Sequence, residues 1–75
     1  MKIYIFENVL KDHFPGMCVV CAESVEQAVK LSIEYTDPNN HGYFTEEFEN
    51  EALTIVGYET SETVPRVLAA IFGSS

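Results

Sequence analysis

Apolar residues in the first third of the chain predict two adjacent β-strands. Residues 2–9 are rich in β-branched and aromatic side chains, and apolar residues occupy both alternating positions, which is typical of a strand covered on both faces. One face would carry Ile3, Ile5 and Val9, and the other Tyr4 and Phe6. Pro15-Gly16 indicates a turn before a second strand at residues 17–23. The short connection predicts a hairpin.

A helix is predicted from Ser24 to about Tyr35. Ser24 and Gln27 have the spacing of a capping box, in which two side chains satisfy free backbone amides at the start of a helix. One face at helical spacing carries Val25, Ala28, Val29 and Ser32. Residues 36–42 are almost all turn formers and predict a loop.

The second half of the chain predicts a helical turn, a strand and a last helix. Thr45 is expected to cap a single helical turn, and residues 52–59 predict a third strand. Thr63 is expected to cap a helix that ends near Gly73. Its apolar positions are Val64, Val67, Leu68 and Ile71, at i, i+3, i+4 and i+7.

These elements predict an α+β fold with the order β-β-α-β-α. The sheet is expected to have three antiparallel strands in the order 2-1-3. The last helix would either cover the second face of the sheet or pack beside the first helix. A single domain is expected over residues 1–73, because 75 residues support one hydrophobic core, and Ser74-Ser75 is interpreted as an artificial tail.

Charge restricts the classes of partner. Twelve Asp and Glu residues against four Lys and Arg residues give a formal net charge of −8. Direct binding to nucleic acid requires a basic surface, which this composition lacks. The charge is also uneven, since the stretch from Leu31 to Pro65 has no Lys or Arg and holds eight of the twelve carboxylates.

Few residues suggest catalysis or metal binding. Cys18 and Cys21 form a C-x-x-C pattern, but two valines between them favour an extended strand that points the thiols to opposite faces. A zinc site of both cysteines with His13 and His41 matches no common spacing. We therefore expect no enzyme activity, no metal and no cofactor.

No apolar run has the roughly 20 residues of a membrane span, and the N-terminus does not resemble a signal peptide. These features predict a cytosolic protein with no membrane partner. The partner is expected to be a basic protein surface. The residues predicted to contact it are Asp37, Tyr43, Phe44, Glu46, Glu47, Glu49, Glu51, Glu59 and Glu62. The residues predicted to form a homodimer interface on the last helix are Val67, Ala70, Ile71 and Phe72.

The opening MKIYIFENV, the following CAESVEQAVKL and the carboxylate run TEEFENE resemble the small acidic phage-encoded inhibitors of the anti-CRISPR type. The resemblance covers the whole chain, is general and includes no defining motif. It implies a protein that acts in the bacterial host cytosol by binding a basic nucleic-acid-binding surface of a CRISPR-Cas effector, with a type I surveillance complex favoured. Such an inhibitor would block DNA binding, in some cases as a nucleic-acid mimic. The alternative is a small cytosolic dimerisation or regulatory module whose acidity only maintains solubility.

Overall fold

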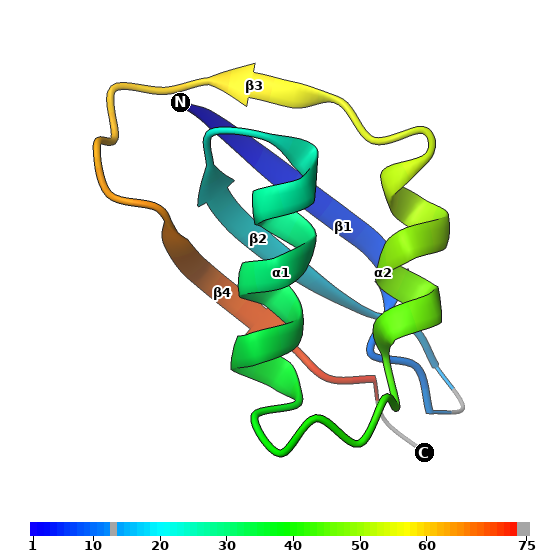
Figure 1. Cartoon of the computed structure of the whole chain (residues 1–75). Helices are drawn as coiled ribbons and strands as arrows, with labels where there is room; N and C mark the ends of the chain where they lie inside the picture. The colour runs from blue at the N-terminus through cyan, green and yellow to red at the C-terminus, as the bar shows by residue number, and fades with distance from the viewer. Residues whose placement is uncertain (13, 74–75) are drawn as a thin grey trace.

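The computed structural model describes residues 1–12 and 14–73, so the predictions about His13 and about Ser74-Ser75 lie outside the described residues. It contains two helices and one four-stranded antiparallel sheet (Figure 1). In chain order the elements are β1 (Lys2–Val9), β2 (Gly16–Ala22), α1 (Val25–Thr36), α2 (Thr45–Ala52), β3 (Gly57–Glu59) and β4 (Arg66–Ile71).

The strand order is β3-β1-β2-β4, which corrects the predicted three-stranded sheet. The α+β class is confirmed, but the expected last helix is a strand that pairs with β2 at the sheet edge. Val19 pairs with Ala69 and Val20 with Val67, so Leu68 is an extra residue in β4.

This bulge explains why the sequence resembled a helix. It places Val67 and Ala70 opposite Val20 and Cys18, so two residues three apart face the same side of the sheet. A strand without a bulge would place them on opposite sides. Without β4, the backbone groups on the outer edge of β2 would lack hydrogen-bond partners. The pairing of β4 with β2 therefore outweighs the helix preference that the local spacing of apolar residues suggests.

The elements before β4 also differ from their predicted bounds. α2 has eight residues rather than a single turn, and its N-cap is Phe44, with no side-chain capping hydrogen bond, instead of Thr45. Because this helix extends to Ala52, β3 is limited to residues 57–59 and pairs only with residues 2–4 of β1. The predicted strand over residues 52–59 was therefore too long.

The prediction for α1 is confirmed at its N-terminus. Ser24 is the N-cap, and its hydroxyl oxygen accepts a hydrogen bond from the Gln27 amide at 3.1 Å. The Glu23 amide donates to the Gln27 side-chain oxygen at 2.7 Å, which completes the reciprocal cap. Ala28 and Ser32 are buried on the predicted face of this helix.

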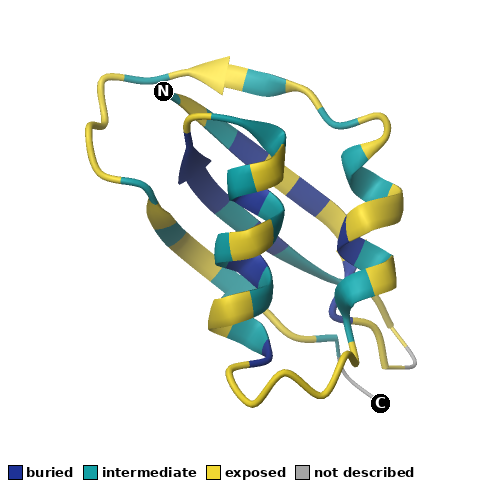
Figure 2. Cartoon of the chain, in the orientation of Figure 1, coloured by how far each residue is buried: buried dark blue, intermediate teal, exposed yellow. Residues whose placement is uncertain are grey.

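Both helices cover the same face of the sheet, and the core lies between the two layers (Figures 1 and 2). Tyr4 and Phe6 of β1 contribute to this core together with Cys18 and Val20 of β2. The Phe6 ring meets Phe48 of α2 edge-on at a centroid distance of 5.1 Å. This contact fixes α2 against β1.

The approach of β4 to β2 can be tested at Gly16. A β-carbon on Gly16 would collide with the carbonyl oxygen of Ile71 in β4. We expect Gly16→Ala to lower the free energy of unfolding by about 1–3 kcal/mol, as overpacking usually does. Urea denaturation measures this change. A neutral substitution, or rapid amide exchange throughout β4, would contradict the pairing of β4 with β2.

Candidate partner-binding surface

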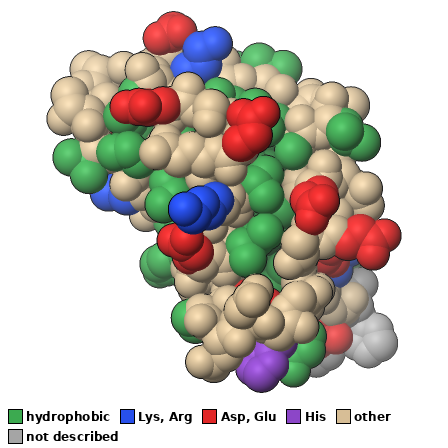
Figure 3. All heavy atoms as spheres, viewed as in Figure 1, with side chains coloured by type: hydrophobic (Ala, Val, Ile, Leu, Met, Phe, Trp, Pro, Cys, Tyr) green, Lys and Arg blue, Asp and Glu red, His purple; other side chains and the backbone are tan. Residues whose placement is uncertain are grey.

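An apolar groove of about 430 Å³ lies between the two helices, on the side of the sheet that the helices cover. Val25 and Val29 line it from α1, and Ala52 and Leu53 line it from the end of α2. The carboxylate-bearing residues Glu26 and Glu49 also line the groove, one from each helix. Figure 3 shows green apolar atoms between the helices with red acidic groups on either side.

Helical spacing produces this groove. Val25 and Val29 are four residues apart in α1 and project from the same side. In α2 the buried Phe48 sets the rotation of the helix, so Ala52, one turn later, also faces inward. Glu49 then remains exposed beside the groove, and Leu53 is 83% exposed just after the helix end.

The four predicted carboxylates of the second helix separate into two groups. Glu46 and Glu49 are exposed, and neither makes a hydrogen bond or ion pair with residues 1–12 or 14–73. Glu47 and Glu51 are half-buried on a different side of α2. Glu47 accepts a hydrogen bond from the Lys11 amide at 3.4 Å. Only Glu46 and Glu49 are thus free to meet a partner on the exposed face of the helix.

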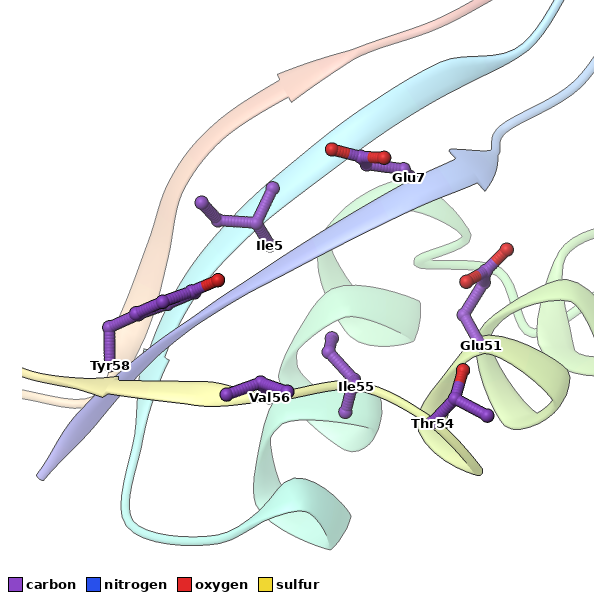
Figure 4. A pocket seen from close by; sticks show the side chains of 7 residues that line it. All are labelled: Ile5, Glu7, Glu51, Thr54, Ile55, Val56 and Tyr58. Atoms are coloured by element: carbon purple, nitrogen blue, oxygen red, sulfur yellow. The ribbon is translucent and has the colours of Figure 1, made fainter.

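Glu51 belongs to a second depression, of about 220 Å³, at the edge of the sheet. Figure 4 shows Glu51 and Thr54 on one side of it and Glu7 and Ile5 of β1 on the other. The depression exists because β3 stops pairing with β1 at Tyr4, and the chain from Thr54 to Val56 diverges from the strand.

Glu59 and Glu62 lie away from the groove. Glu59 ends β3, and Glu62 follows in the loop that leads to β4. Glu62 forms an ion pair with Arg66 at 3.2 Å, and both side chains are nearly half exposed. An exposed pair of this kind contributes little to stability. The structure therefore does not unite all predicted acidic residues in a single surface.

Asp37 has an internal role. Its side chain is 5% exposed, and its two oxygens accept hydrogen bonds from the amides of His41 at 3.0 Å and Gly42 at 2.7 Å. These bonds fold the loop that follows α1. The His41 amide makes the largest contribution to lowering the pKa of the Asp37 carboxyl, and the Gly42 and Tyr43 amides lower it further, while burial opposes them.

The two predicted aromatic contacts differ in exposure. Tyr43 is 71% exposed and stacks on His41 at a centroid distance of 5.1 Å. Phe44 packs against the core and lies 5.9 Å from the ring of Phe72. Tyr43 is therefore accessible to a partner, whereas Phe44 mainly packs the start of α2 against Phe72, which directly follows β4.

The residues predicted as a helical dimer interface do not share one surface. Val67 and Ala70 pack against the core below the helices, while Ile71 and Phe72 are exposed, by 58% and 54%. The sequence prediction also missed Ala52 and Leu53, because it placed them in a strand. The signal in the sequence is the helical spacing of Phe48 and Ala52 in the Glu-rich segment, followed directly by the apolar Leu53.

The cysteines are buried in the sheet as free thiols. Cys18 lies opposite Phe6, and Cys21 lies opposite Ile3, so the two thiols project to opposite faces. The Cys18 thiol contacts the Ser32 hydroxyl at 3.6 Å, and burial raises its pKa although this contact lowers it. A raised pKa disfavours the reactive thiolate. In the part of the chain that the structure describes, no three His, Cys, Asp or Glu side chains gather as a metal site.

The role of Asp37 predicts a pH-dependent effect on stability. A carboxyl with a lowered pKa stabilises the fold above its unfolded pKa, near 3.8, and loses this effect as the pH falls through its folded value. We expect Asp37→Asn to lower the melting temperature at pH 7. The difference from the wild type should narrow below pH 3.8. An unchanged melting temperature at pH 7, or a difference that widens in acid, would contradict this role.

Neither α1 nor α2 has the length and apolar character needed to cross a membrane, and this holds for every helix within the described residues. Comparisons with protein-family models, curated proteins and solved structures found no match to this chain.

Proposed function

We propose that this chain is a stoichiometric protein inhibitor that acts in the bacterial cytosol by binding a basic, nucleic-acid-binding surface of another protein. The observation that carries this proposal is the apolar groove between α1 and α2 with the carboxylates of Glu26 and Glu49 beside it. An acidic surface of this kind competes with phosphates for Lys and Arg side chains.

The groove has the chemistry that a long basic side chain requires. Lys and Arg combine an aliphatic stem with a charged end group, and they bury the stem while the charge stays near water or a counter-charge. Val29 and Ala52 offer the apolar contact, and Glu49 offers the counter-charge. A partner with several exposed Arg or Lys residues is therefore favoured over an uncharged one.

The wider charge of the chain supports the same partner. With a formal net charge of −8, the molecule attracts basic surfaces over several ångströms and repels nucleic acid. Glu46 lies three residues before Glu49 in α2, on the neighbouring turn, and its exposed carboxylate extends the acidic surface. The acidic groups would speed association, and the apolar groove would slow dissociation.

The particular target remains a prediction based on the resemblance to anti-CRISPR proteins. On that basis the partner is a type I surveillance complex, whose DNA-binding surface would be occupied by α1 and α2. No metal, cofactor or catalytic step is part of this proposal, because occupancy of the surface is sufficient for inhibition.

The test uses a purified type I surveillance complex and labelled target DNA. Preincubation with this chain should abolish DNA binding at about one chain per binding site, measured by fluorescence anisotropy. Raising the salt concentration should weaken the inhibition, because exposed charges are screened beyond about 8–10 Å at physiological ionic strength. The Glu46→Gln/Glu49→Gln variant should raise the inhibitory concentration about tenfold or more.

A matched control is Glu59→Gln/Glu62→Gln, which removes the same charge at a distance from the groove. We expect this control to inhibit nearly as well as the wild type. Equal loss in both variants would show that only net charge matters and would contradict the groove as the site. Failure of the wild type to block DNA binding at any salt concentration would reject this target.

A further inference from the structure

The face of the sheet opposite the helices is apolar, which is unusual for a sheet face left to solvent. Antiparallel sheets with one solvated face usually alternate apolar and polar residues along each strand. Here the outward positions of the three longer strands carry seven apolar side chains. They are Ile3, Ile5, Met17, Val19, Cys21, Ala69 and Ile71, and we call this surface the open face.

The strand register brings these side chains together. Ile5 lies beside Val19, and Val19 lies beside Ala69, which gives a row across three strands. Tyr58 of β3 adjoins Ile3 and continues the surface to the far edge. Both helices lie on the other side of the sheet (Figure 1), and Figure 4 shows Ile5 and Glu7 projecting from β1 away from α1. Neither helix therefore covers the open face, on which Cys21 is fully buried and the other apolar side chains are at least partly exposed.

Solvent reaches much of this surface in the single chain. Ile71 is 58% exposed, Tyr58 57% and Ile5 37%. Val56, beside Tyr58 at the edge depression, is also 61% exposed and widens the apolar area. A contiguous exposed apolar surface of this kind marks an interaction site in proteins.

The distribution of charge favours a second copy of the chain as the partner of the open face. Among the outward strand positions only Glu7 and Arg66 are charged, and their charges are opposite. The chain as a whole has a net charge of −8, so two copies repel each other through most orientations. Two copies repel each other least when their open faces meet, because this face carries one of the twelve carboxylates, Glu7.

The size of the open face also favours a second copy of the chain as the partner. Three strands, β1, β2 and β4, lie about 4.8 Å apart with about six residues of 3.4 Å each and form a surface of roughly 15 by 20 Å, which the three residues of β3 extend at one edge. A single extended or helical peptide would cover only part of it, whereas a second sheet packed about 10 Å away would cover all of it. We propose that two copies of this chain associate through their open faces as a two-fold symmetric sheet-on-sheet dimer.

The projected area of about 350 Å² per copy is less than half of the roughly 800 Å² per partner in a standard interface. We therefore expect a reversible dimer that forms at micromolar or higher concentration. Salt should strengthen it, since screening reduces repulsion between the two acidic chains while apolar contacts persist. This dependence is opposite to that expected for the groove, so the two interactions can be tested separately.

The experiment is sedimentation equilibrium of the purified full chain from micromolar to millimolar concentration, at low and high salt. The Ile5→Lys and Ile71→Lys variants place a charge on the open face at positions already exposed in the monomer. Each should raise the dimer dissociation constant at least about tenfold. Leu53→Lys makes the same change in the groove on the other side of the molecule and should leave the dimer unchanged.

Circular dichroism spectra matching the wild type would show that the variants retain the fold. A wild-type chain that stays monomeric at all concentrations would overturn the proposal. So would a dimer that Leu53→Lys dissociates but the two open-face variants do not. A monomeric wild type whose open-face variants lose inhibition of the surveillance complex would assign this face to the partner, and would also overturn the proposal.

Discussion

The β1–β2 hairpin has apolar side chains on both faces, and residues 1–12 and 14–73 provide a single layer of helices, which covers one of them. Tyr4 and Phe6 face the helices, while Ile3 and Ile5 face the other side. Burial of apolar area is the main favourable contribution to folding, so the first face determines where α1 and α2 pack. The second face keeps its apolar residues without a helix over it in the part of the chain that the structure describes. The architecture and both proposed interactions follow from this asymmetry.

Much of the first half of the fold could be predicted from the sequence, because its signals are local. The hairpin follows from two β-rich segments around Pro15-Gly16, and α1 follows from the Ser24 and Gln27 cap. The second half depends on contacts between distant residues. β4 forms because the outer edge of β2 needs a backbone partner, and its bulge at Leu68 gives the segment a helix-like spacing.

For the candidate site, the sequence allowed a prediction of the acidic charge but not of the arrangement of the side chains. The acidic character of residues 45–51 was visible in the sequence, and Glu46 and Glu49 are indeed exposed. The sequence could not show that Asp37 folds its own loop or that Glu47 accepts a hydrogen bond from the Lys11 amide. Such roles depend on three-dimensional neighbours. The groove was missed because it requires α2 to continue to Ala52 and to lie beside Val29 of α1.

The two faces of the molecule differ in chemistry in a way that separates their proposed roles. The helical face combines carboxylates with a narrow apolar groove, which suits basic side chains. The sheet face is broad and nearly uncharged, which suits a second copy of the chain. Because the sheet and its core separate these faces, both surfaces can be occupied at the same time.

The most direct test of this separation is nuclear magnetic resonance of isotopically labelled protein, with chemical shifts followed first on dilution and then on addition of the basic partner. We predict that dilution changes the shifts of β1, β2 and β4 around Val19, whereas the partner changes those of α1 and α2 around Val29 and Glu49. Two coincident sets of shifted residues, or no change at residues of the open face on dilution, would contradict the separation of the two surfaces.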